Sequence, residues 1–186
     1  MSGILRYYGR VSGENLSNGS RWIRQKEKRM DKLDVRIVTL PPMRVACINA
    51  FSESPEEDAF GKMVAWAKSH GQFGKPHRIF GYDNPTQSPG SPNRGYDVWL
   101  TVDKSVEADG EARIIEFPGG LYAVTRVDVK NPWEDIPSTW QKLVKWMEAG
   151  KYHHGRHQWL EEHIGPLEDM GGDKPFTLDL HLPIAE

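Results

Sequence analysis

The segment KYHHGRHQWLEEHIG (151–165) concentrates side chains that could do chemistry: four histidines, two adjacent glutamates and a tryptophan. Such a set could bind a metal ion, carry out acid–base catalysis or form one wall of a binding pocket. The choice depends on whether Glu161 lies on a helix or on a strand, because this decides which neighbours share its face.

A metal site is not expected in this segment. The two zincin signatures are absent, since three residues lie between His157 and Glu161. On a strand, His157 and His163 would lie about 20 Å apart at about 3.3 Å per residue, whereas metal–ligand bonds are about 2 Å long. Phosphate-binding, dinucleotide-binding and nucleophile-elbow motifs are also absent. We therefore expect neither a metal nor a cofactor, and we interpret the histidines before Trp159 as surface residues.

The composition of the chain limits the classes of protein to which it can belong. With 186 residues and 38% hydrophobic content, the sequence favours one packed domain. A net charge of −2 does not favour direct nucleic-acid binding. The single cysteine, Cys47, excludes a disulfide within the chain, and no apolar run is long enough for a membrane span. Because the N-terminus also lacks a signal-peptide core, we expect a cytoplasmic protein.

Residues 1–33 differ from the rest of the chain. They contain eight Lys or Arg against three Asp or Glu, with Gly, Ser and Asn residues within 12–20. This pattern predicts a basic, partly disordered arm in front of a domain over residues 34–186. The alternative is a partial DNA-binding segment, although the arm has room for one helix and a helix-turn-helix needs two.

From residue 34 onward the sequence repeats itself. The segments VRIVTLPPMRVACI (35–48) and ARIIEFPGGLYAVT (112–125) each predict two strands joined by a turn with proline. A capping box at 54–57 predicts one helix start, and a matching box at 138–141 predicts another. The expected buried stripes, 80 positions apart, are Phe60, Met63, Val64 and Ala67 in the first helix and Trp140, Leu143, Val144 and Met147 in the second.

A third matching pair completes the repeat, because YDVWLTV (96–102) and LDLHLPI (178–184) align 82 positions apart. We therefore predict an α+β fold built from a duplicated β-β-α-β-β unit. It would have a pseudo-twofold antiparallel sheet, two main helices and a central ligand cleft where the halves meet.

The repeat also bears on Glu161. An offset of about 80 places HQWLEE against RIFGYD (78–83), which has the pattern of a strand running into a turn. Trp159, Glu161 and His163 should then share one strand face, with Leu160 on the other. The helical alternative, with His157 and Glu161 one turn apart, stays open.

Five motifs in this order resemble the GyrI-like small-molecule-binding domain, also called the AraC-type effector-binding domain. They are YDVWLTV, FPGGLYAVT, WQKLVKWMEAGKY, HQWLEEHIG and LDLHLPI, within residues 34–186. The resemblance implies the same duplicated fold with a central cleft. In transcription regulators this domain senses drug-like, often cationic and aromatic compounds, and Glu161 matches a glutamate of its pocket. Some stand-alone members resemble hydrolases of strained cyclopropanoid toxins, and others bind DNA gyrase. This chain has no recognisable DNA-binding domain, so regulation of transcription does not follow from the resemblance.

We take Glu161 and Tyr122 as candidate catalytic residues, with Trp159 as a neighbouring aromatic. The remaining candidate ligand-binding residues are Asp97, Trp99, Trp146, His163, Asp179 and His181. Several of these residues alternate with apolar residues along a predicted strand. Such alternation is also typical of polar side chains that simply face water on an antiparallel sheet.

A carboxylate beside aromatic rings suits a cationic aromatic ligand. If partly desolvated, it would have a raised pKa and could act as a general base or acid. Three functions follow. The first is a stand-alone binding protein for amphipathic small molecules, a sensor or a protective sequestering protein. The second is a hydrolase with Glu161 as base and Tyr122 or Trp159 positioning the substrate. The third is an interaction module that inhibits a partner such as gyrase; a homodimer is left open.

Overall fold

An antiparallel sheet organises the domain, in the strand order β1-β6-β9-β8-β3-β4-β2-β5, with β7 paired to β9. The computed structural model describes residues 33–170 and 174–186, so the predicted arm lies outside the described residues except for Leu33. The strands are β1 (Arg36–Leu40), β2 (Met43–Ser52), β3 (Ile79–Asp83), β4 (Arg94–Thr101), β5 (Arg113–Phe117), β6 (Gly120–Val129), β7 (His153–His154), β8 (Leu160–Ile164) and β9 (Phe176–Ala185).

The strand order confirms the duplicated α+β fold. β5, β2, β4 and β3 form one half of the sheet, and β1, β6, β9 and β8 form the other, with β3 and β8 adjacent at the pseudo-twofold axis. Phe80 pairs with Trp99 in the first half, and Leu160 pairs with His181 in the second. These positions are 80 and 82 residues apart, which are the spacings of the sequence repeat.

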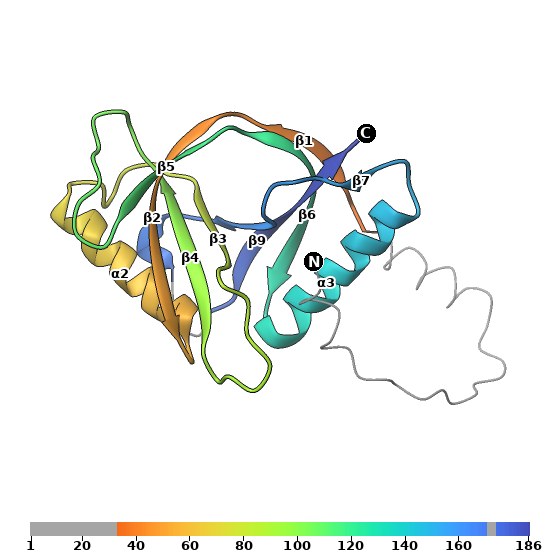
Figure 1. Ribbon diagram of the computed structural model, residues 1–186, viewed down its shortest axis with the longest axis horizontal. Helices are drawn as coiled ribbons and strands as arrows, with labels where there is room; N and C mark the ends of the chain where they lie inside the picture. The colour runs from red at the N-terminus through yellow and green to blue at the C-terminus, as the bar shows by residue number, and fades with distance from the viewer. Residues whose placement is uncertain (1–32, 171–173) are drawn as a thin grey trace. The chain divides into compact units, whose positions relative to one another are not determined.

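The first strand of each repeat crosses to the other half. β1 pairs with β6 rather than with β2, which follows it directly, and β5 pairs with β2. Figure 1 shows β1 running beside β6. The two crossovers touch, because a Cβ on Gly119 would lie 2.4 Å from the carbonyl oxygen of Leu40. Gly119 also has φ of 82°, a conformation that favours glycine. Each half therefore depends on a strand from the other.

Helices α2 (Pro55–Ser69) and α3 (Pro132–Glu148) each begin at a proline, and the two prolines are 77 positions apart. The predicted helix start at 138–141 is wrong, since these residues lie inside α3. Ser138 and Thr139 instead hydrogen-bond back to the carbonyl oxygen of Asp135. Because these hydroxyl residues follow Pro137, they resemble the residues that begin a helix, but the chain is already helical there. Neither Ser54 nor Asn131 makes a side-chain cap, and proline and acidic residues favour both starts.

The sheet separates two cores. Its helix face packs against α2 and α3, and in the first half it carries Tyr96, Val98 and Leu100. Its inner face, on the opposite side, holds a second cluster that includes Phe80, Trp99, Phe117, Tyr122 and Leu160. Side chains alternate along every strand, so the register decides which residues can meet.

We expect Met63→Ala and Leu143→Ala each to lower the free energy of unfolding by about 2–5 kcal/mol, because both side chains are fully buried at equivalent helix positions. Urea unfolding measures the change. Val64→Ala and Val144→Ala, at partly buried neighbours, serve as controls and should cost less. A loss below about 1 kcal/mol at either core site would contradict the equivalence of the two stripes.

Candidate functional site

The carboxyl group of Glu161 lies where the two halves of the domain meet. Strand β8 places its side chain on the helix face, since Glu161 pairs with Gly81. The hydroxyl of Tyr96 on β4 donates to Oε2 at 2.9 Å, and Nε1–H of Trp140 on α3 donates to Oε1 at 3.2 Å. Each half of the repeat thus supplies one donor, and both donors are uncharged.

Burial raises the pKa of Glu161 to about 7. The two hydrogen bonds from Trp140 and Tyr96 lower it, while the negative charges of Asp83 and Glu56 raise it further. Burial disfavours an ionised carboxylate when no cation compensates it. The group is therefore poised to change its protonation state near neutral pH.

Gly81 makes room for the contact between Tyr96 and Glu161. A Cβ at this position would lie 2.1 Å from the Tyr96 hydroxyl oxygen, so a larger residue would displace the ring. The repeat spacing of 80 places Gly81 where the second half has Glu161. One half contributes the carboxyl group, and the other contributes the space in which it is bound.

Aromatic rings flank the carboxyl group on the side of α3. Trp140 packs against Trp159 with ring centroids 5.0 Å apart, and Trp159 stacks on His154 at 6.0 Å. Trp159 directly precedes β8 and lies beside Trp140, which donates to Glu161. Indole faces attract cations, which makes this wall suited to a positively charged group.

His163 shares the helix face with Glu161, two residues further along β8. Its ring makes an edge contact with Phe60 at 4.7 Å and stacks on Phe176 at 5.8 Å. Burial lowers the pKa of His163 to about 4, so the ring is neutral at pH 7. Nε2 is buried and has no hydrogen-bond partner among the described residues.

Two more carboxylates act on Glu161 from the first half, with one arginine between them. Arg94 forms ion pairs with Glu56 at the start of α2 and with Asp83 at the end of β3. Burial raises the pKa of Asp83. Counting Glu161, the group has three carboxyls and one guanidinium, so its electrostatics favour a cation over an anion.

The structure places five candidate residues on the inner face, away from Glu161. They are Asp97, Trp99, Tyr122, Asp179 and His181. The tyrosine that contacts Glu161 is Tyr96 and not Tyr122, because alternate residues of a strand point to opposite faces. The Tyr122 hydroxyl instead donates to the Gln158 carbonyl oxygen at 3.3 Å.

The inner-face carboxylates are paired with cations. Asp97 accepts hydrogen bonds from Tyr82 and Arg113, and Asp179 accepts from Arg36 and Arg126. The buried aspartates of YDVWLTV and LDLHLPI therefore belong to networks of hydrogen bonds and ion pairs.

Glu162 also lies on the inner face. Burial raises its pKa, but hydrogen bonds from His181 and Arg78 outweigh this and hold the pKa at about 2. The adjacent glutamates of the sequence therefore lie in opposite environments. The last candidate, Trp146, lies on α3 and stacks on Tyr152 at 6.0 Å.

Sequence reasoning missed Tyr96, Trp140 and Gly81 as neighbours of Glu161. Trp140 and Tyr96 follow apolar patterns, which are typical of core residues. The one available signal was the offset of 80, which aligns Gly81 with Glu161.

Among the described residues, no group of three or more His, Cys, Asp or Glu is arranged to hold a metal ion. No described helix is long and apolar enough to cross a membrane.

Glu161→Gln should stabilise the protein above pH 7. The folded-state pKa of about 7 exceeds the ordinary value of 4.5, so the favourable contribution of the protonated carboxyl is present below pH 4.5 and is lost as the pH rises to 7. Glutamine cannot ionise, and the gain at pH 8 should reach about 3 kcal/mol at most. Chemical unfolding at pH 4.5 and pH 8 measures it. An equal effect of the substitution at both pH values would contradict the buried, unpaired carboxylate.

Comparisons with known proteins agree with the fold. The structure resembles EcmrR in its DNA complex, with a TM-score of 0.64 and 12% identity over 89% of this chain. The chain spans 62% of the length of that EcmrR chain. It also resembles the EcmrR C-terminal domain, with a TM-score of 0.60 and 10% identity over 83% of this chain and 98% of that one.

A third similar structure is described as a hydrolase from Listeria innocua, with a TM-score of 0.51 and 11% identity over 88% of this chain and 98% of that one. At these identities the likeness shows the fold alone. No curated protein matches the sequence. The family model of the GyrI-like small molecule binding domain matches residues 33–169. The chain therefore belongs to the GyrI-like small molecule binding domain family.

Proposed function

We propose that this domain binds cationic, aromatic small molecules at Glu161, as a sensor or as a sequestering protein. The observation that carries the proposal is the partly buried carboxyl group, which has two neutral donors and no cationic partner among its described contacts. An unpaired buried charge is costly, and a ligand cation would supply the missing partner.

The surroundings support the same ligand class. The indoles of Trp140 and Trp159 offer faces to a cation or to an aromatic ring. Asp83 and Glu56 add negative potential. His163 is held neutral by burial, so it adds no positive charge to the site at pH 7. A ligand with a positive charge and a planar apolar body would use all of these features.

The test compares a naphthylmethyl-trimethylammonium ion with an uncharged naphthylmethyl ether by calorimetric titration. Glu161→Gln should weaken binding of the cation by about 1–3 kcal/mol and leave the ether nearly unchanged. The ligand has no titratable group, so pH dependence reports on the protein. Affinity should fall below pH 7, because the cation needs the ionised carboxylate.

Glu162→Gln is the matched control, since it makes the same change one residue along, on the inner face. It should leave cation binding nearly intact, with circular dichroism confirming that each variant is folded. Equal losses in both variants, or affinity that does not change between pH 5.5 and 8, would rule out Glu161 as the cation site.

A hydrolase is the second candidate, and the pKa of Glu161 favours it. A general base works best when its pKa lies near the operating pH, and the pKa of Glu161 is about 7. Glu161 would accept a proton from the attacking water, while the Tyr96 hydroxyl at 2.9 Å would hold the carboxyl group in place.

Incubation with a neutral, strained cyclopropane electrophile tests this candidate, with the hydrated product followed by mass spectrometry. In a hydrolase, Glu161→Gln should lower turnover by about 10²- to 10⁴-fold with little change in binding. Turnover that survives the substitution would show that Glu161 is not the base. Cation binding without turnover would leave the binding protein as the better description.

A further inference from the structure

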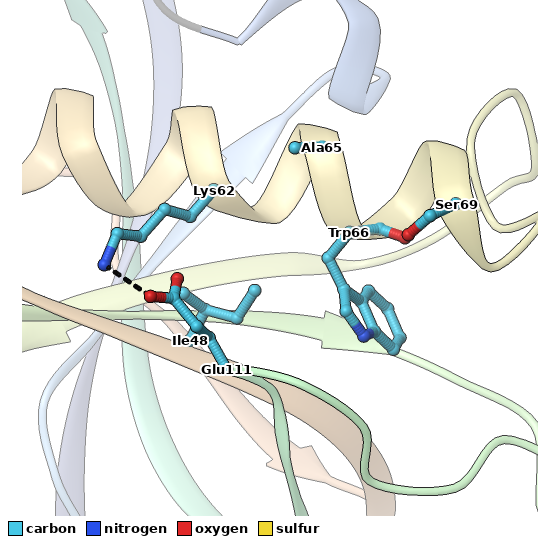
Figure 2. Close-up of a pocket in the computed structure, with 6 residues that line it drawn as sticks. All are labelled: Ile48, Lys62, Ala65, Trp66, Ser69 and Glu111. Carbon is cyan, nitrogen blue, oxygen red and sulfur yellow. Dashed lines mark hydrogen bonds and ion pairs between the residues drawn. The ribbon is translucent and has the colours of Figure 1, made fainter.

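A pocket lies on the flank of α2, beside the strand β2. It has a volume of about 270 Å³ and is lined by Ile48, Lys62, Ala65, Trp66, Ser69 and Glu111. Figure 2 shows the helix above the pocket, with the Trp66 indole projecting from it toward the strands. Four of the lining residues follow the spacing i, i+3, i+4, i+7, so one face of α2 forms a wall of the pocket.

This pocket is separate from the Glu161 site. α2 contacts the Glu161 region through Phe60, which packs on the His163 ring at 4.7 Å. Lys62 and Trp66 instead line the pocket together with Ile48 of β2 and with Glu111, which precedes β5. None of the residues lining the pocket contacts Glu161 through a hydrogen bond or ring contact in the described structure.

One residue that lines the pocket, Trp66, has an unused hydrogen-bond donor. Trp66 is only 6% exposed, and its Nε1–H is buried without a partner among the described residues. Its ring is held in place by stacking on His70, with centroids 4.6 Å apart. Leaving a buried donor unpaired is unfavourable, so an acceptor supplied by a ligand would be stabilising.

Opposite charges also line the pocket. Lys62 Nζ lies 3.2 Å from Glu111 Oε1, and Figure 2 marks this ion pair. Both side chains are substantially exposed, at 43% and 64%, so the pair contributes little stability and separates easily. Ile48 and Ala65 supply apolar surface next to the two charges.

We infer that this pocket binds a small zwitterion with a planar apolar body, of the kind represented by an aromatic α-amino acid. Its carboxylate would accept hydrogen bonds from Lys62 and from the Trp66 indole, which lie one helical turn apart. Its ammonium group would pair with Glu111, so each side chain of the separated ion pair keeps a partner. The ring would contact Ile48 and Ala65.

Three probes with the same phenyl body test the inference: L-phenylalanine, 3-phenylpropionate, which lacks the ammonium group, and phenylethylamine, which lacks the carboxylate. Indole N–H signals in ¹H–¹⁵N spectra report binding, and Trp66→Phe identifies the Trp66 signal. L-Phenylalanine should shift this signal with a dissociation constant of about a millimolar, as expected for a ligand of this size. The two truncated probes should bind at Trp66 at least about fivefold more weakly.

Lys62→Met and Glu111→Gln should each weaken L-phenylalanine binding by about fivefold or more, as expected for a half-exposed charge contact. Lys68→Met is the matched control, because Lys68 lies on the same helix against Phe73 and does not line the pocket. Ala65→Phe, which fills the pocket, should abolish the shift.

Two results would overturn the inference: no change in the Trp66 signal at 20 mM L-phenylalanine, or equal binding of all three probes there. Glu161→Gln should leave L-phenylalanine binding unchanged, so failure of this inference is distinguishable from failure of the Glu161 site. Loss of L-phenylalanine binding in Glu161→Gln would place the zwitterion at Glu161 and would also overturn the inference.

Discussion

The burial of one carboxyl group without a cationic partner is the constraint on which the Glu161 site depends. Glu161 is held by the hydroxyl of Tyr96 and the indole of Trp140, which come from different halves of the repeat. Such an arrangement disfavours the ionised state and raises the pKa to about 7. It can persist only because the rest of the domain fixes both donors in position.

The crossing strands provide much of this rigidity. β1 and β5 each complete the sheet of the opposite half, and the crossovers touch at Gly119. The two halves therefore cannot separate without breaking strand pairing. Because Glu161 and its donors span the junction, a site of this kind needs the duplicated fold as a whole and could not form in one half alone.

The chain treats its buried carboxylates in two ways. Asp179 and Glu162 lie on the inner face, where arginine and histidine partners hold their pKa values low. Glu161, next to Glu162 in sequence, points to the helix face and has neutral donors only. The first arrangement stabilises the ionised form, whereas the second leaves a charge that a ligand can satisfy. Successive side chains of one strand point to opposite faces of the sheet, and this separates the two roles.

The sequence alone determined the duplicated α+β fold, the core stripes of both helices and the strand that carries Glu161. These features follow from local periodicity and from the near-constant spacing of the repeat, which a chain displays before it folds. Only the tertiary structure decided which residues surround Glu161 and that each first strand crosses over. Tyr96 and Gly81 reach Glu161 through strand register, and Trp140 reaches it through helix packing. Register and packing arise from contacts between residues distant in sequence, and a shift of one residue would exchange the two faces of a strand.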